Sequence, residues 1–172
     1  MKNMLFIMNP KAGRTTLKNS LVDVLEVFCN NDYAVRTYLT KSADDAERIV
    51  QEEGANYDVI VCAGGDGTLG NTVTGYMKSG IRVPLGYIPC GSTNDFARSM
   101  DIPRETVEAA EMIVKAEPFS IDIGSLNDKN FVYVAAFGMF SDTSYATPQN
   151  MKNIFGHAAY VLQGIKSLAN VP

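Results

Sequence analysis

Residues 57–68 read YDVIVCAGGDGT, an apolar run that passes directly into a glycine-rich turn. A short apolar run bounded by turn residues is typical of a strand buried on both faces of a parallel sheet, so residues 57–63 predict such a strand. After the turn, apolar residues recur at helical spacing until Gly80: Leu69, Val73, Tyr76 and Met77. This stretch therefore predicts a strand, a glycine turn and a helix in direct succession.

The same alternation of strand and helix extends to both sides of this stretch. Further strands are predicted at residues 4–8, 33–39 and 83–88. Between and after them, helices are predicted at four places: one capped by Thr15 or Thr16 and closed by Asn30 and Asn31, one from Ser42 to Gly54, a short one over residues 94–100, and one with Pro103 as its first residue. The alternation predicts an α/β fold, a Rossmann-like open and mostly parallel sheet with helices on both faces.

The pattern changes after Pro118. Residues 119–123 and 131–137 predict two strands joined by a hairpin turn at residues 127–130, and residues 158–168 have a helical period. Two strands and a helix cannot enclose a core by themselves. We therefore expect an α/β domain at residues 1–118 and, at residues 119–172, the beginning of an incomplete, β-rich second lobe.

Three turns, each directly after a predicted strand, carry the polar and glycine residues of interest. They are residues 9–13 (NPKAG), 64–68 (GGDGT) and 91–95 (GSTND). Because the carboxyl ends of parallel strands share one edge of an open sheet, these turns are expected to converge there.

The chemistry of the three turns suits phosphate. Glycine lets successive backbone N–H groups approach a ligand closely, and a helix that begins next places partial positive charge against an anion. Asp66 would repel a bare phosphate unless a divalent cation or a water network lies between them, and we infer a nucleotide with Mg²⁺. Thr68 and Ser92 offer hydroxyl donors, and the amide of Asn94 would hold either the loop or the ligand.

Two other nucleotide-binding patterns fit less well. Residues 65–70 (GDGTLG) satisfy GxGxxG, but they follow the third predicted strand and lack an acidic residue roughly 20 positions further on. The P-loop pattern GxxxxGK[ST] does not occur in the sequence. Both a Rossmann dehydrogenase and a P-loop enzyme are therefore disfavoured.

Residues 9–13, 64–68 and 89–98 resemble the three signature segments of diacylglycerol kinases, and PCGSTNDFAR at 89–98 is the most specific of them. The wider superfamily includes sphingosine and ceramide kinases, with NAD kinase and phosphofructokinase as remoter relatives. Residues 122–124, the region around Gly138 and residues 158–166 resemble the opening of the family's second lobe. The resemblance implies that the sequence is truncated at its C-terminal end.

The resemblance also implies the residues of an ATP site. Those expected to line it are Asn9, Pro10, Lys11, Ala12, Gly13, Thr40, Gly65, Asp66, Gly67, Thr68, Leu69, Gly70, Asn71, Ser92 and Asn94. Asp66 and Asp95 would belong to the catalytic network around metal and phosphates, and no metal ligand is assigned. The sequence departs from the family in two places: Gly70-Asn71 replaces the usual Asn-Glu, and Thr93 replaces a common glycine.

The function implied is an ATP- and Mg²⁺-dependent lipid kinase that phosphorylates a hydroxyl of a membrane lipid such as diacylglycerol. In bacterial members of the family, the catalytic base and the structural magnesium ligands lie in the second lobe, so the 172 residues alone are expected to be nearly inactive. An NAD-kinase-like or sugar-phosphate kinase, and a non-catalytic nucleotide-binding module, remain the alternatives.

Composition and net charge limit the kinds of partner that we expect for this protein. The net charge of −4 gives no broad field for nucleic acid, and no basic patch suggests more than transient, peripheral contact with a membrane. The three cysteines lack metal-type spacing and suit a reducing compartment. Without a signal-like segment or a run of ~18 apolar residues, we expect a cytoplasmic protein, peripheral at the inner membrane face. The sequence leaves open whether the protein forms a homodimer.

Overall fold

A four-stranded parallel sheet lies at the centre of the computed structural model, which describes residues 1–12, 16–126 and 129–132. Its strands are β1 (Lys2–Met8), β2 (Tyr33–Leu39), β3 (Val59–Gly64) and β4 (Leu85–Pro89). The segments that connect these strands contain α1 (Thr16–Asn30), α2 (Asp45–Glu53), the short 3-10 helix η1 (Gly54–Asn56) and α3 (Asp66–Ser79). After β4 come α4 (Asp95–Ser99) and α5 (Thr106–Lys115).

The strand order is β2-β1-β3-β4, and every neighbouring pair is parallel. β1 and β3 are therefore central. Residues 4–8 of β1 are at most 3% exposed, and all six residues of β3 are buried. Burial on both faces explains why these strands are uninterrupted apolar runs in the sequence.

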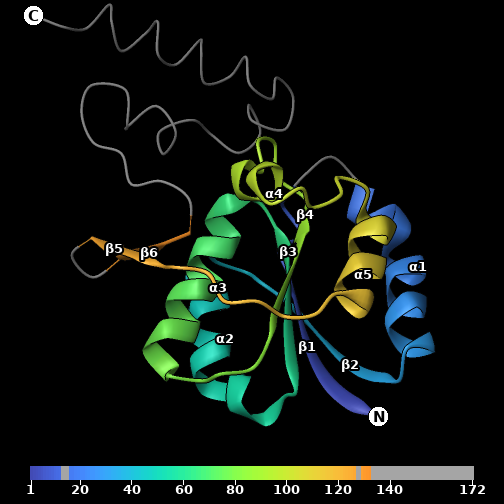
Figure 1. The fold of residues 1–172 in the computed structure, drawn as a ribbon, viewed down its shortest axis with the longest axis horizontal. Helices are drawn as coiled ribbons and strands as arrows, with labels where there is room; N and C mark the ends of the chain where they lie inside the picture. Colours follow the sequence, from blue (N-terminus) through green and yellow to red (C-terminus); the bar gives the residue numbers. More distant parts are fainter. Residues whose placement is uncertain (13–15, 127–128, 133–172) are drawn as a thin grey trace, which may run out of the picture. The chain divides into compact units, whose positions relative to one another are not determined.

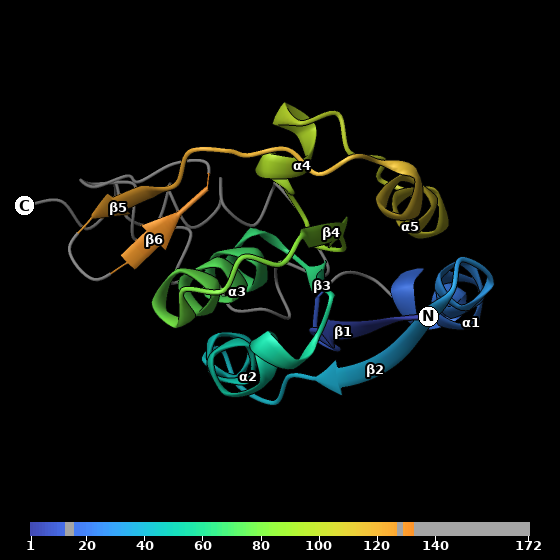
Figure 2. The same cartoon turned by 60° about the horizontal axis from the view of Figure 1, so that its bottom comes forward.

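Helices cover both faces of the sheet (Figure 1; Figure 2). Alternate residues of β1 point to opposite faces. Met4, Phe6 and Met8 pack with residues of α1 and α5, whereas Leu5 and Ile7 pack with α2. α3 covers the same face as α2, with Leu69 and Val73 against β3 and β4. The predicted α/β fold, a parallel sheet between two helical layers, is confirmed.

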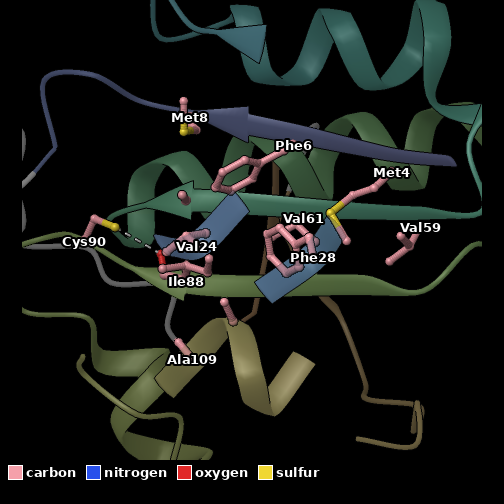
Figure 3. Packing of buried hydrophobic residues seen from close by; sticks show 12 residues of the cluster. Met4, Phe6, Met8, Val24, Phe28, Val59, Val61, Ile88, Cys90 and Ala109 are labelled. Atoms are coloured by element: carbon pink, nitrogen blue, oxygen red, sulfur yellow. Dashed lines mark hydrogen bonds between the residues drawn. The ribbon is translucent and has the colours of Figure 1, made fainter. Parts of the chain in front are cut away.

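Aromatic packing anchors the α1 layer. The rings of Phe6 and Phe28 meet edge to face with centroids 5.6 Å apart, and both side chains are fully buried. Figure 3 shows them among Met4, Val24 and Val61. Burying a side chain of this size contributes roughly 1.5–3 kcal/mol.

Two predicted helix starts were wrong. α2 begins at Asp45 instead of Ser42, because the Asp45 carboxylate accepts the backbone N–H groups of Lys41 (2.6 Å) and Ser42 (3.1 Å) and so holds them outside the helix. α5 begins at Thr106 instead of Pro103. Its first turn is closed by the Glu105 carboxylate, which accepts the N–H groups of Val107 and Glu108, an arrangement that satisfies two otherwise unpaired donors.

The predicted hairpin exists but at other residues. It consists of β5 (Gly124–Leu126) and β6 (Lys129–Phe131), which pair antiparallel, whereas residues 119–123 form no strand. Phe131 lies opposite Gly124 in this pairing, and a side chain on Gly124 would overlap the ring as it now lies. The hairpin is in contact with α3, and Val132 packs against the cluster that contains Leu69.

The rest of the expected second lobe lies outside the described residues, including residues 133–137 of the second predicted strand and the helix expected at residues 158–168. Within the described part of the chain, no helix is long and apolar enough to cross a membrane.

Candidate functional site

The carboxyl ends of β1 and β3 form the point at which the chain switches direction within the sheet. β2 lies on one side of this pair and β4 on the other. In open α/β sheets, ligands bind outside the carboxyl ends of the strands at this switch point. Two backbone bonds align the turns that leave it: Asn9 donates to the carbonyl of Ala63 (3.0 Å), and Cys90 donates to that of Gly64 (2.7 Å). The three turns therefore start side by side.

The first turn is tied to the second by Asn9. Its Nδ2 donates to the hydroxyl oxygen of Thr68 at 3.0 Å, and its Oδ1 accepts the backbone N–H of Lys11 at 2.9 Å. The amide of Asn9 thus shapes its own turn and connects it to the start of α3. Because the Thr68 oxygen acts as acceptor here, its hydroxyl hydrogen is left to donate elsewhere.

The second and third turns are in direct backbone contact. A Cβ atom on Gly91 would lie 2.5 Å from the Cα of Gly65, and one on Gly65 would lie 3.2 Å from the Cα of Gly91. Any larger residue at position 91 would push the two turns apart. Glycine is required here because the two backbones approach each other closely. The close approach to a ligand that the sequence leads us to expect of these glycines stays a prediction.

Asp66 holds the third turn through both of its carboxylate oxygens. Oδ2 accepts the backbone N–H of Asp95 at 3.2 Å, and Oδ1 accepts that of Phe96 at 3.3 Å. The Thr93 hydroxyl also lies 3.5 Å from Oδ2. Figure 1 shows α4, which these donors begin, at the same end of the sheet as the carboxyl end of β4. The negative charge of Asp66 is therefore placed at the positive end of α4.

Asn94 closes the third turn on itself. Its Oδ1 accepts the N–H of Gly91 at 2.8 Å, and its Nδ2 donates to the carbonyl of Gly91 at 2.9 Å. Its backbone is left-handed, with φ 53°, a conformation that asparagine tolerates better than most residues. Of the two roles foreseen for this amide, the structure shows the one that holds the loop; direct contact with a ligand stays a prediction.

Tyr87 is a positioning residue that the sequence reasoning missed. Its buried hydroxyl lies 3.1 Å from the carbonyl oxygen of Gly64 and 3.4 Å from Oδ1 of Asn94, so it links the second turn to the third. Burial, and then the Asp66 charge, raise the pKa of this phenol, which therefore stays protonated and able to donate. In the sequence, the signal for this role was the Tyr87 hydroxyl, a single polar side-chain atom within the apolar strand at residues 85–89.

Thr40 supplies a polar group at the end of β2. Its backbone N–H donates to the carbonyl of Met8 at 2.9 Å, so it lies beside the end of β1. The residue is only 7% exposed, and among the described residues its hydroxyl has no hydrogen-bond partner. A buried hydroxyl without a partner costs free energy, so a ligand that accepts from Thr40 would recover that cost.

The other predicted site residues differ in their exposure and contacts. Pro10, Ala12, Gly70 and Ser92 are half-buried near the turns, and Lys11 and Gly67 are exposed. Leu69 is 2% exposed and packs into the core, so only its backbone remains for a ligand. Asn71 reaches away from the glycine turns and donates to the carbonyl of Ala43. Gly13 lies outside the described residues.

In the part of the chain that the structure describes, no group of three or more His, Cys, Asp or Glu side chains is arranged so that it could hold a metal ion. This does not conflict with Mg²⁺, which proteins usually hold through one or two carboxylates together with substrate phosphates and water. Asp66 and Asp95, which begin α3 and α4, are the carboxylates that the converging turns bring to this edge.

The sequence model of the diacylglycerol kinase catalytic domain matches residues 3–126, which include all three turns. This chain belongs to that family. Among curated members, it is 37% identical to a diacylglycerol kinase of Bacillus subtilis (strain 168) over 99% of its own length and 57% of the relative's. The identity is also 37% with a diacylglycerol kinase of Staphylococcus aureus (strain JH9), over 97% and 53% of the two lengths.

A crystal structure of a diacylglycerol kinase from Bacillus anthracis str. Sterne has the same fold. It superimposes with a TM-score of 0.70 at 32% identity, covering 76% of this chain and 45% of that one. The present chain spans about half the length of the family members it matches.

Proposed function

We propose that the protein to which this chain belongs is an ATP-dependent lipid kinase, and that the chain carries its ATP-binding portion. The reaction would transfer the γ-phosphoryl group of ATP to a hydroxyl of a membrane lipid, with diacylglycerol as the first candidate. Membership of the diacylglycerol kinase catalytic domain family supports a lipid kinase. ATP, Mg²⁺ and the identity of the lipid are the parts proposed here.

The observation that carries the proposal is the direct contact of two glycine turns, Gly65 against Gly91, at the switch point of the sheet. Phosphoryl transfer depends mainly on positioning and electrostatic stabilisation. Turns that are locked to each other by Asn9, Asp66 and Tyr87 present backbone N–H groups in a fixed arrangement, which such positioning requires.

The residues at the carboxyl edge of the sheet would have different roles in binding the nucleotide. Backbone groups of the glycine turns and the hydroxyls of Thr68 and Ser92 would bind the phosphates, and Thr40 would donate to a part of the nucleotide nearer β2. Asp66 and Asp95 would belong to the network around Mg²⁺ and the phosphates, and Mg²⁺ would supply neutralising charge to the phosphates when bound. We would assign the lipid pocket and the group that deprotonates the lipid hydroxyl to the part of the relatives' length that this chain does not cover.

The deciding experiment measures phosphate transfer by the complete protein from γ-labelled ATP, with four acceptors tested in parallel. These are vesicles containing diacylglycerol, vesicles containing a sphingoid base, NAD, and a sugar phosphate. We expect label in diacylglycerol, dependent on Mg²⁺. Label in NAD or in the sugar phosphate alone would overturn the lipid assignment, and tight ATP binding with no labelled acceptor would favour a non-catalytic nucleotide-binding module.

The proposal includes a transient, peripheral contact with the membrane that presents the lipid. It is tested by sedimenting the complete protein with anionic vesicles in the presence and absence of ATP. The 172 residues assayed alone are expected to turn over far more slowly than the complete protein. An equal rate would contradict the assignment of the lipid pocket and the deprotonating group to residues outside this chain.

A further inference from the structure

Asn71 connects α3 to the segment between β2 and α2. Its Nδ2 donates to the backbone carbonyl of Ala43 at 2.7 Å, across 28 residues of sequence. Ala43 lies two residues before α2 begins. Asn71 is also one of the positions at which the sequence departs from the pattern that diacylglycerol kinases usually have.

The bond continues a stripe of contacts between α2 and α3. Asn71, Gly75 and Lys78 are spaced four and three residues apart, so they share one face of α3. A side chain on Gly75 would overlap the carbonyl of Glu47, and Lys78 forms an ion pair with Glu47 at 2.7 Å. Asn71 is the member of the stripe nearest the start of α3, and it contacts the loop before α2 instead of α2 itself.

The loop at residues 40–44 is fixed at both ends as well. The N–H of Thr40 donates to Met8 of β1, and the N–H groups of Lys41 and Ser42 donate to the Asp45 carboxylate in α2. The Asn71 bond at Ala43 is a hydrogen bond that joins this loop to α3. Together these bonds determine where the buried Thr40 hydroxyl lies.

Only a donor at position 71 can make this bond. A carboxylate there would set its oxygens against the carbonyl oxygen of Ala43, and the two would repel each other. Ala43 is exposed, so water can replace the amide at little cost to overall stability. Losing the bond should therefore affect where the loop lies more than whether the protein folds.

The order of the sheet gives the loop a specific place relative to a nucleotide. β2 is separated from β3 by β1, and neighbouring strands lie about 4.8 Å apart, so the ends of β2 and β3 are roughly 10 Å apart. A nucleotide with its phosphates on the turns after β3 and β4 would reach the end of β2 with its nucleoside end. We propose that Asn71 is a positioning residue that holds the loop at residues 40–44, and with it the Thr40 hydroxyl, against the nucleoside end of ATP. This proposal rests on the proposed ATP site.

The test compares Asn71→Ala and Asn71→Asp with the unchanged complete protein. Alanine removes the donor but favours helix more than asparagine does, so a loss of ATP affinity in that variant cannot come from a weaker α3. We expect KM for ATP to rise about fivefold in Asn71→Ala and more in Asn71→Asp, with kcat within about twofold, because the lost contact would be made equally in the ground and transition states.

A second readout does not involve ATP. Hydrogen exchange of the Lys41 and Ser42 amides, measured without nucleotide, should be faster in both Asn71 variants. Lys78→Met is the matched control, since it removes another contact of the same stripe farther along α3 and should change neither the exchange of these amides nor KM for ATP.

Unchanged exchange at Lys41 and Ser42, or KM values within twofold of the unchanged protein in both variants, would overturn the inference. A fall in kcat at constant KM would also overturn it, because Asn71 would then act on the transfer step. If the unchanged protein fails to bind ATP, the proposed ATP site is wrong, whereas the exchange data still decide whether Asn71 holds the loop.

Discussion

The backbones of Gly65 and Gly91 touch, although they belong to turns that follow different strands. A Cβ atom added to Gly91 would lie 2.5 Å from a backbone atom of Gly65, which has no side-chain freedom with which to move away. The two turns can occupy their observed positions only while position 91 carries no side chain.

Gly91→Ala is therefore expected to force the turns apart. Overpacking of this kind costs about 1–3 kcal/mol of unfolding free energy, and ATP affinity should fall with it. Gly70→Ala is the control, since apart from the adjacent backbone of α3 no atom lies within 4 Å of the added methyl group, and alanine in a helix interior should raise stability by about 0.5–1 kcal/mol. Chemical denaturation measures both changes, and equal stability of the two variants would contradict the contact.

Asp66→Asn should destabilise the protein even when no nucleotide is present. The amide nitrogen of asparagine would face a backbone donor of α4, where a carboxylate oxygen now accepts, at a cost of about 1–2 kcal/mol. Asp95→Asn is the comparison, because the Asp95 carboxylate makes no hydrogen bond among the described residues. If Asp66 served only metal and phosphates, the nucleotide-free stability of Asp66→Asn would equal that of the unchanged protein.

The three cysteines should divide into one reactive and two protected thiols. Cys29 is exposed, whereas Cys62 and Cys90 are buried. We expect Ellman's reagent at pH 8 to label Cys29 quickly and the other two only after denaturation. Fast native labelling of Cys62 or Cys90 would contradict their burial.

The buried thiols also predict a pH dependence of stability. Burial raises the pKa of Cys62 and of Cys90 from about 9.0 to about 12. Between these values the folded protein keeps protons that the unfolded chain loses, so the contribution of these thiols to the unfolding free energy falls as pH rises above about 9 and is constant below it. Each thiol contributes up to about 1.4 kcal/mol per pH unit, so Cys90→Ala should make the fall between pH 9 and 10 shallower.

Glu105 should stabilise the start of α5 only while it is ionised. Hydrogen bonds from the N–H groups at the start of the helix, that of Glu108 first, lower its pKa below the usual 4.5. A lowered folded-state pKa gives stability that is present above pH 4.5 and is lost as the pH falls through the folded value. Glu105→Ala should therefore cost about 1 kcal/mol at pH 7 and progressively less in acid, as followed by thermal unfolding; a cost that does not change with pH would contradict the cap.

Local sequence pattern predicted most of the elements, and its errors came from side chains that form local bonds. Residues 33–39 form the strand predicted for them, and the whole strand pairs in parallel with β1. The start of α5 was misplaced because proline is merely tolerated in a first turn, whereas the Glu105 carboxylate pairs with two N–H groups. The hairpin was displaced because residues 119–123 form no strand and the pairing begins at Gly124.

The sequence by itself determined that strands and helices alternate and that three polar turns follow strands, since hydrophobic period and turn chemistry act over a few neighbouring residues. Tertiary structure alone decided which polar groups hold one another. Asn9 bonds to Thr68, Asp66 to the start of α4, and Asn71 to Ala43, between partners 28 to 59 residues apart in the chain. Such pairs form only because parallel strands bring their carboxyl ends to one edge, and no local pattern specifies which donor will face which acceptor there.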